Sequence, residues 1–357
     1  MKDHDFSESP EFAALRKLSA KVGANPLLVQ GAGGNTSIKE NGLLWIKASG
    51  RWLAHSERDE IFVPVEISPL LGALASDHAD AEKAEKFVLQ ALNPSDLRPS
   101  IETTVHALMP QKIVVHVHCV ETIALAVQAN AEAIIVDRLR GLAYAFIPYR
   151  RPGLPLAKAI AERLKPDTNI LILGNHGLAV AADTVAEAEE LLSQVSQLLK
   201  VVPRKAPSAD VAALVRLALG SDYRLPADER AHSVATDLVS CKMAAAGSLY
   251  PDHVVFLGVG SFIAGPNDSA SSIADAARSD GQLLPVSILF PGKGILMRND
   301  ANAGADAMAL CLADVTSRIA ETATLRYLND SEHGELLNWD AEKYRQELNR
   351  RNGATLQ

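Results

Sequence analysis

The chain has 357 residues, of which 48% are hydrophobic and 22% are charged, and its formal net charge is −8 at pH 7. This length predicts two domains, each large enough to bury a core without disulfide bonds. The negative charge disfavours binding to nucleic acid and to anionic membranes, and no apolar run in the sequence is long enough for a membrane-spanning helix.

The first half of the chain alternates between patterns typical of helices and of strands. Ser9 and Pro10 are good residues for a helix start, β-branched runs indicate strands, and the sequence Gly-Asn-His-Gly indicates a turn. The predicted elements are, in chain order, a helix at 7–24, a hairpin around 27–48 formed by the apolar runs 27–30 and 43–50, helices at 79–92 and 100–109, a strand at 112–120, helices at 121–129 and 154–164, two short strands within 169–182, and a helix to about residue 200.

The second half begins with a change in composition. Residues 201–211 contain proline and serine and predict a linker between two domains, 1–205 and 206–357. Because helices and strands alternate in both halves, we expect the α/β class, and short strands joined by tight turns predict antiparallel pairing in part of the sheet. The elements predicted after the linker are a helix near 229–246, a strand at 253–259, a helix near 269–278, strands at 286–290 and 295–298, and a helix over roughly 301–329.

The cysteines and the N-terminus indicate the compartment. Cys119, Cys241 and Cys311 are widely spaced. An odd number of widely spaced cysteines argues against a disulfide framework and fits a reducing environment. The first twenty residues carry acidic side chains early and lack the apolar centre of a signal peptide. We therefore expect a cytoplasmic protein.

Three histidines predict a metal site. His116 and His118 lie at alternate positions of the predicted strand 112–120, so that both imidazoles project from one face and can meet one ion. The alternative is a pair of half-buried sheet histidines with no ligand role. His176 favours the metal, because three neutral imidazoles form the ligand set of a catalytic zinc site with a fourth position open. We expect zinc or another divalent ion here.

Glu102 is the candidate carboxylate beside that metal. It lies in the first turn of the predicted helix 100–109, where a glutamate can serve the helix dipole alone. The functional alternative is a general base beside the metal, or a fourth ligand that the substrate displaces. His106 shares a helix face with Glu102, and we expect it to have a structural role, orienting Glu102 or packing beneath it.

Three short segments combine glycines with small hydroxyl side chains. They are GAGGNTS at 31–37, KASG at 47–50, and Ser100 at the predicted helix start. Backbone N–H groups in such loops can line an anion site, and helix N-termini bind phosphate through the same groups. The first segment is not a dinucleotide or nucleotide-phosphate fingerprint, and a plain hairpin loop is its alternative. Three such segments near one metal would suit a phosphorylated substrate.

Taken in order, the motifs GGNTS, IKASG, PSIETTVH, HVH and GNHGL resemble those of the class II aldolase/adducin family. This family includes fuculose-phosphate and rhamnulose-phosphate aldolases and ribulose-phosphate 4-epimerase. The resemblance covers roughly residues 10–200. Residues 200–357, with SDYRLPADER, YPDHVVFLG and PGKGIL, are similar to the continuation of the aldolase half of bifunctional rhamnulose-phosphate aldolase/dehydrogenase proteins.

The resemblance implies a three-layer α/β/α sandwich with a mainly antiparallel central sheet, followed by a smaller C-terminal α/β domain. It implies zinc bound by His116, His118 and His176, with Glu102 as the catalytic carboxylate at the metal. The family's phosphate aldolases usually have two serines before this glutamate; here Ile101 stands in the second place, which removes one donor. The positions that match the family's phosphate-binding residues are Gly34, Asn35, Ser49, Gly50 and Ser100.

Two classes of function follow from the resemblance. The first is a zinc-dependent aldolase that cleaves or forms a small ketose, such as a deoxyketohexose 1-phosphate, through an enediolate. A pentulose-phosphate 4-epimerase and a 3-oxo-acid-phosphate decarboxylase are alternatives within the family. The second class is a non-catalytic scaffold like adducin, which the retained histidines and glutamate disfavour. Because family members are commonly homotetramers, we expect a homo-oligomer with a sugar or sugar phosphate as its partner, and no nucleic acid or membrane.

Overall fold

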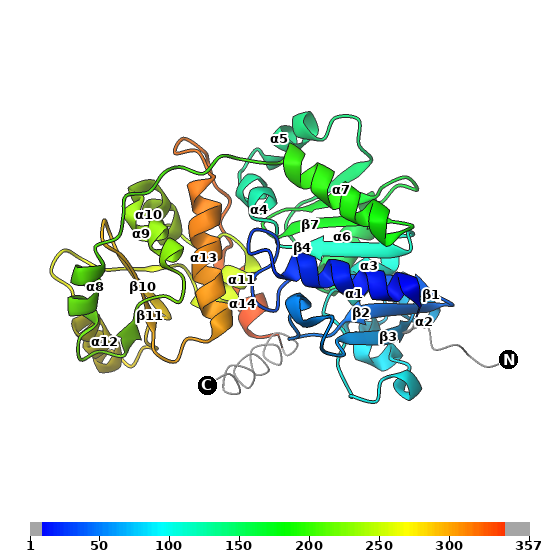
Figure 1. Cartoon of the computed structure of the whole chain (residues 1–357), viewed down its shortest axis with the longest axis horizontal. Coiled ribbons are helices and arrows are strands. Elements are labelled where there is room, and N and C mark those ends of the chain that lie inside the picture. Colours follow the sequence, from blue (N-terminus) through cyan, green and yellow to red (C-terminus); the bar gives the residue numbers. More distant parts are fainter. Residues whose placement is uncertain (1–8, 340–357) are drawn as a thin grey trace. The chain divides into compact units, whose positions relative to one another are not determined.

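The structure is a computed structural model that describes residues 9–339 (Figure 1). These residues form two compact units. The first unit consists of residues 9–122 together with residues 131–200, and the second consists of residues 123–130 together with residues 201–339. The chain therefore changes unit at 122/123, at 130/131 and at 200/201. The domain boundary expected at 205/206 stays a prediction.

A seven-stranded sheet lies at the centre of the first unit (Figure 1). Neighbouring strands run antiparallel except for the pair at one edge, β5 and β6, which is parallel. The expected mainly antiparallel sheet is thus confirmed. In spatial order the strands are β3 (Phe62–Glu66), β2 (Leu43–Lys47), β1 (Asn35–Glu40), β4 (Ile113–Val117), β7 (Gly177–Ala182), β6 (Ile170–Leu173) and β5 (Tyr144–Ile147).

Two long helices cover one face of this sheet (Figure 1). The helix α1 (Pro10–Gly23) begins with a proline, and Ser9 before it caps the main-chain N–H of Phe12. Phe12 packs edge-on against Trp45 of β2, with ring centroids 5.6 Å apart. The helix α7 (Val185–Leu198) packs against β4 and β7. The start of the first predicted helix, at residues 7 and 8, lies outside the described residues.

The opposite face is covered by shorter helices. Side chains alternate along a strand, so Leu44 and Ile46, the neighbours of Trp45 in β2, point away from α1. They form a core with α2 (Ile67–Ala75). A second core joins α3 (Thr103–Leu108) and α6 (Leu154–Arg163) to β4, β6 and β7. Helices on both faces of one sheet make the three-layer α/β/α sandwich that was expected.

The hairpin differs from the prediction in its first strand. Residues 27–30 form turns and irregular backbone, and the strand that pairs with β2 is the polar sequence NTSIKE of β1. Its turn is Asn41-Gly42, whose φ angles of 50° and 79° are those a two-residue hairpin turn needs. The helix predicted at 79–92 was also wrong: this stretch forms three short 3₁₀ helices, η3 (Ala79–Glu82), η4 (Ala84–Phe87) and η5 (Gln90–Leu92).

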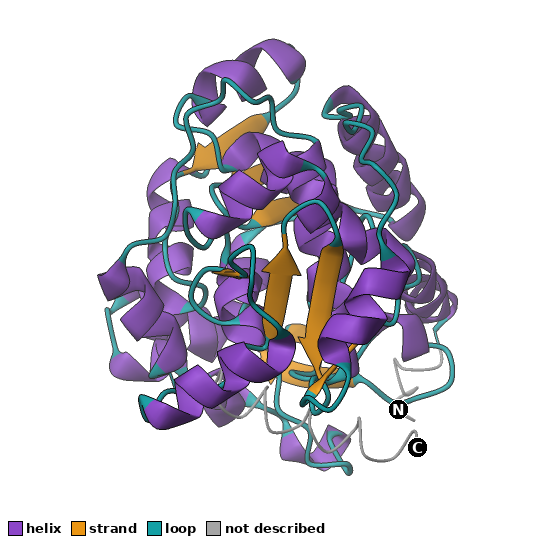
Figure 2. Cartoon of the chain, turned by 90° about the vertical axis from the view of Figure 1, so that its left-hand side faces the viewer, coloured by secondary structure: helices purple, strands orange, loops and turns teal. Residues whose placement is uncertain are grey.

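The second unit contains a four-stranded mixed sheet. Its strands follow the order β8 (Tyr223–Arg224), β11 (Gly294–Arg298), β10 (Ser287–Phe290) and β9 (Phe262–Ile263), and only β9 and β10 are parallel. A core beneath the sheet includes residues of α8 (Val211–Ala218) and α12 (Ala270–Ser279). In Figure 2, where colour marks secondary structure, helices account for most of what faces the viewer.

Three predictions for this unit were wrong in type or extent. The β-branched run at 253–259 is not a strand but part of α11 (Pro251–Leu257), because Pro251 starts a helix and Gly258, with a φ of 93°, ends it. The helix predicted over 301–329 ends early, as α13 (Ala303–Ser317). The helix predicted near 229–246 is divided into η6 (Glu229–His232), α9 (Ser233–Thr236) and α10 (Leu238–Ala245). Within residues 9–339, no helix is both long and apolar enough to cross a membrane.

Candidate metal centre

Two neighbouring strands bring the three predicted histidine ligands together. His116 lies in β4, and His118 follows one residue after that strand ends. His176 lies in the turn between β6 and β7. Because β4 and β7 are antiparallel, with Val117 opposite Leu178, the end of β4 and the start of β7 lie at the same edge of the sheet. All three side chains are buried, at 1–6% exposure.

The three imidazoles and the carboxylate of Glu102 form one compact cluster. The ring centroids of His116, His118 and His176 are 5.0–5.2 Å apart in all three pairs. Each of these residues and Glu102 offers one ligand atom, and the four atoms lie within 4.8 Å of one another. Nitrogen and oxygen donors at this spacing could hold one divalent metal ion.

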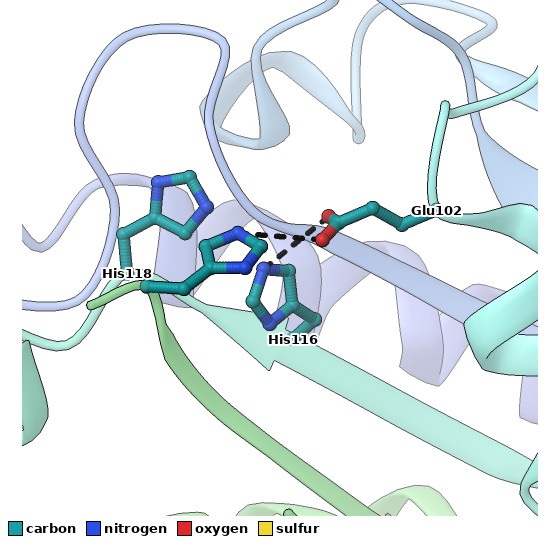
Figure 3. A group of neighbouring side chains, drawn as sticks. Glu102, His116 and His118 are labelled. Carbon is teal, nitrogen blue, oxygen red and sulfur yellow. Dashed lines mark ion pairs between the residues drawn. The ribbon is translucent and has the colours of Figure 1, made fainter. Parts of the chain in front are cut away.

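Glu102 points from the start of α3 toward the histidines (Figure 3). Its Oε2 atom lies 3.3 Å from Nε2 of His116, and its Oε1 atom lies 3.3 Å from Nε2 of His176. The side-chain amide of Asn35 donates a hydrogen bond of 2.8 Å to Oε2. Burial raises the pKa of Glu102, but the three histidines and Asn35 outweigh it and lower that pKa to about 2. Glu102 is therefore a carboxylate at neutral pH.

A main-chain contact sets the orientation of His116. Its Nδ1 lies 3.0 Å from the carbonyl oxygen of Leu178. A carbonyl oxygen only accepts hydrogen bonds, so Nδ1 carries the proton and Nε2 presents its lone pair toward Glu102 and the other histidines. Such a second contact commonly fixes the tautomer of metal-binding histidines. The donor set, its burial and this tautomer all fit a divalent ion.

Glycines allow the close approach of the chain around the cluster. A Cβ atom at Gly177 would lie 2.4 Å from the carbonyl oxygen of Val117, and one at Gly33 would lie 2.8 Å from Nδ1 of His118. Asn175, beside His176, has a φ of 52°, a conformation that asparagine tolerates better than most residues. The sequence around His176 is thus explained by the turn it must form.

The five predicted phosphate-binding residues lie on three segments that contact one another. The Asn35 amide also donates to Oγ of Ser100 at 3.1 Å, and that oxygen accepts the main-chain N–H of Glu102 at 3.2 Å. The main chains of 47–50 and 98–100 are joined by hydrogen bonds, including one of 2.9 Å from Ser49 N–H to the carbonyl oxygen of Arg98. Gly34 and Gly50 both adopt positive φ, 58° and 71°.

His106 has a structural position rather than a place in the cluster. It is fully buried, and its Nδ1 lies 2.7 Å from Oγ of Ser37 in β1. Burial lowers the pKa of His106 to about 3, so the ring is neutral. The structural role expected for His106 agrees with this position. Its hydrogen-bond partner, Ser37, could not be inferred, because strand β1 was not predicted.

One residue of this region was not singled out from the sequence. Lys47 ends β2, is only 2% exposed, and donates a hydrogen bond of 2.6 Å to the carbonyl oxygen of Ala32 in the glycine loop. A lysine at the end of a strand normally faces solvent. Its place inside the motif KASG was the one available signal.

The sequence pattern of class II aldolase and adducin N-terminal domains matches residues 14–202, which contain the whole cluster. The chain belongs to the class II aldolase and adducin family. Among solved structures, the N-terminal class II aldolase domain of a conserved protein from Thermoplasma acidophilum is 28% identical, over 54% of this chain and 92% of that chain, with a TM-score of 0.47. The L-fuculose-1-phosphate aldolase of Thermus thermophilus is 16% identical, over 58% of this chain and 96% of that chain, with a TM-score of 0.37.

A longer relative matches part of both units. The protein named uncharacterized oxidoreductase YuxG, from Bacillus subtilis, is 26% identical over 272 residues. The match covers 66% of this chain and 39% of that protein. This chain therefore spans about two fifths of the length of that relative.

Proposed function

We propose that this chain is a zinc-dependent class II aldolase that cleaves or forms a small phosphorylated ketose. One observation carries the proposal: a buried carboxylate, Glu102, lies 3.3 Å from Nε2 of both His116 and His176, with the ring of His118 completing the cluster. Burying four polar side chains without a ligand is costly, and family members such as fuculose-phosphate aldolases support this reaction type.

A divalent ion held by the three histidines and Glu102 would supply positive charge that polarises a carbonyl group, worth several kcal/mol in the transition state. Zinc fits the three-histidine donor set best. The residues themselves provide the ligand geometry: the Leu178 carbonyl orients His116, and Asn35 orients Glu102.

Glu102 would move the proton. In the direction of bond formation, it takes the proton from the carbon next to the ketone carbonyl. That carbon then bonds to the aldehyde carbon, whose double bond to oxygen becomes single, and the oxygen takes up a proton from water. In cleavage the hydroxyl gives up this proton as its carbon–oxygen bond becomes double, the same carbon–carbon bond breaks, and Glu102 returns the first proton to the carbon next to the ketone carbonyl. Because Asn35 donates to Oε2, we assign the transfer to Oε1. A positioned base of this kind contributes roughly 10²–10⁴ in rate.

The loops beside the cluster would bind the phosphate. Buried Asn35, Ser49 and Ser100 supply side-chain polar atoms, and the positive-φ glycines Gly34 and Gly50 allow main-chain N–H groups to approach an anion. Ile101 contributes no donor there, so the phosphate would rest on fewer hydroxyl groups than in relatives with two serines.

The experiment is a screen of zinc-loaded protein against ketose phosphates and unphosphorylated ketoses, with aldehyde release as readout. Glu102→Gln should keep its zinc and lose turnover about 10²–10⁴-fold, whereas Glu60→Gln, at a side chain 70% exposed, should keep both. Undiminished turnover in Glu102→Gln would refute the assignment of the base. Less than about a tenth of an equivalent of bound metal would instead favour a non-catalytic scaffold like adducin.

We further propose a reducing compartment, the cytoplasm, and a homo-oligomeric state. Cys119, Cys241 and Cys311 are all buried free thiols, which supports the first. The second follows from family membership, and sedimentation analysis tests it directly.

A further inference from the structure

A cavity of about 330 Å³ opens between α1 and α7, the two long helices that cover one face of the seven-stranded sheet (Figure 1). Every residue that lines this α1/α7 cavity belongs to the first unit. None of them is a member of the metal cluster or of the segments 31–37, 47–50 and 98–100. The cavity is therefore separate from the candidate metal centre, and its volume lies in the range of small-molecule binding sites.

The walls of the α1/α7 cavity are largely aliphatic. Leu18 and Val22 of α1 and Leu192 of α7 line it and are only 3–4% exposed. Half-buried Leu27 and Leu28, from the turns that follow α1, complete these walls. Sites for small molecules typically combine apolar walls with a few polar groups that orient the ligand. We therefore expect the body of a ligand in this cavity to be aliphatic.

Two buried oxygen-bearing side chains also line the cavity. Glu121 is 9% exposed, and its Oε2 atom accepts a hydrogen bond of 3.8 Å from the Cys119 thiol. The Oγ atom of Ser196 is buried and has no hydrogen-bond partner among the described residues. A buried polar atom without a partner lowers stability, and its retention next to a cavity points to a ligand that satisfies it.

The chemistry of these two groups indicates which ligand they suit. A carboxylate only accepts hydrogen bonds, and a hydroxyl oxygen has two acceptor sites. A primary ammonium group has three donors and no acceptor, so it can donate to Glu121 and to Ser196 at once. Its positive charge also matches the carboxylate, and such charge-assisted hydrogen bonds are about twice as strong as neutral ones.

The charges at the rim of the cavity do not reverse this preference. Lys21 and Glu189 form an ion pair of 2.5 Å with each other, and their side chains are 74% and 41% exposed. Lys200 is exposed as well. Exposed charges are screened by water and salt, whereas a buried charge acts with less screening. Glu121 therefore dominates the electrostatic preference of the cavity.

We propose that the α1/α7 cavity binds a small primary amine as its alkylammonium ion. The ammonium group donates to the Glu121 carboxylate and to Oγ of Ser196, and the aliphatic chain lies against Leu18 and Leu192. An anionic ligand would bring a second negative charge beside Glu121, and a neutral alcohol would forgo the charge attraction. The inference is independent of the proposed reaction, because no residue of this cavity takes part in it.

The test is titration calorimetry of the zinc-loaded chain with isoamylamine, isoamyl alcohol and isocaproate, which share one branched aliphatic chain. Isoamylamine should bind saturably, and the other two at least about tenfold more weakly. Glu121→Gln keeps the size of the side chain and removes its charge, so it should weaken amine binding at least about tenfold. Ser196→Ala should weaken it roughly two- to tenfold. Glu190→Gln, at an exposed residue of α7 outside the cavity, should bind the amine as the wild type does.

Several results would overturn the inference. One is the absence of saturable amine binding below about 10 mM. Another is an affinity for isoamyl alcohol or isocaproate equal to that for the amine, because the cavity would then not recognise the ammonium group. Wild-type affinity in Glu121→Gln would remove the proposed partner. Equal losses in Glu121→Gln and Glu190→Gln would show that the amine responds only to the overall charge of the protein.

If Glu121→Gln does not fold, the wild-type chain itself carries the test. The methyl resonances of Leu27 and Leu192, assigned by their loss in Leu27→Ile and Leu192→Ile, should shift as isoamylamine is added. Those of Leu156, in the core beneath the opposite face of the sheet, should stay in place. Unshifted Leu27 and Leu192 resonances at amine saturation, or equal shifts in all three residues, would overturn the inference.

Discussion

Asn35 and His116 lie directly opposite each other in the ladder between β1 and β4. This register joins two motifs that are far apart in the sequence, the glycine loop that ends at Asn35 and the histidine pair that begins at His116. Asn35 then donates to Oε2 of Glu102, and the same oxygen lies 3.3 Å from Nε2 of His116. A slip of one residue in this pairing would turn Asn35 to the other face of the sheet. The ladder therefore determines the geometry of the cluster.

Replacing His116 should remove the metal. His116→Ala takes away one of three nitrogen donors, and it leaves Glu102 buried with one polar neighbour fewer. After loading with zinc and removal of excess ion, the wild-type chain should hold roughly one equivalent and His116→Ala far less. Plasma mass spectrometry measures this. His78→Ala, at an exposed histidine outside the cluster, is the control. Full zinc content in His116→Ala would show that His116 is not a ligand.

Adding one methyl group at Gly177 should destabilise the first unit. The new Cβ would lie 2.4 Å from the carbonyl oxygen of Val117, and relieving that overlap should cost about 1–3 kcal/mol. Gly72→Ala is the matched control, because Gly72 lies in the exposed interior of α2 with nothing within 4 Å. That change should stabilise the protein by roughly 0.5–1 kcal/mol. Urea unfolding measures the free energy of unfolding of both variants. Equal changes in Gly177→Ala and Gly72→Ala would contradict the steric explanation.

The second unit should lose stability in mild acid because of His253. Burial lowers the pKa of this fully buried histidine to about 4, from an ordinary value of 6.5. Between these values the unfolded chain binds a proton that the folded chain does not, so stability is complete above pH 6.5 and falls as the pH drops toward 4. The loss between pH 7.5 and pH 5 should be about 2 kcal/mol.

His253→Asn tests this pH dependence. Its side-chain oxygen can replace Nδ1 of His253, which accepts the main-chain N–H of Leu249 at 3.3 Å, and it does not titrate. The free energy of unfolding, measured in urea at pH 7.5 and pH 5, should therefore change about 2 kcal/mol less in the variant than in the wild type. The same change in both proteins would assign the acid sensitivity to other groups.

Arg204 should stabilise the start of the second unit. Its guanidinium donates to Asp237 at 2.7 and 3.0 Å, to Ser240 at 3.0 Å and to main-chain oxygens of Thr316 and Ile319. Hydrogen bonds to charged groups contribute about 1.5–3 kcal/mol, so Arg204→Ala should cost about 2 kcal/mol in thermal or urea unfolding. Arg140→Ala, at a side chain 81% exposed, should cost less than about 0.5 kcal/mol. A cost below that limit for Arg204→Ala would contradict its role.

The grouping of the histidines was predicted better than its surroundings. His116 and His118 were recognisable because a strand places alternate residues on one face. The turn around His176 was recognisable from its glycines, which the close backbone contacts at this turn require. The strand β1 was not predicted, because its polar residues show no apolar alternation, although most of them are buried and α1 packs against the strand. The position of Lys47 was likewise not predictable, since local sequence does not report burial.

The clearest error in the predicted secondary structure concerns a short apolar run. HVVFLGV at 253–259 suits a strand by composition, and only Pro251 before it and Gly258 within it indicate a helix. The single helix predicted at 79–92 was wrong as well: its helix-forming residues occur in three short 3₁₀ helices that pack against α2 and β3. The first error could thus have been avoided from local sequence, whereas the tertiary contacts of the second are reported by no local pattern.

The eight residues 123–130 have a consequence for anyone who wishes to produce the family domain alone. They lie inside the matched range 14–202, yet their contacts assign them to the second unit. The N–H of Ala129 donates to Thr324, the carbonyl of Val127 accepts from Arg326, and Gln128 forms a bridge with Leu325. A gene truncated after codon 200 would encode a chain in which these main-chain groups have lost their hydrogen-bond partners. The sequence after residue 200 resembles an ordinary linker, but a domain truncated there lacks the partners of these main-chain groups.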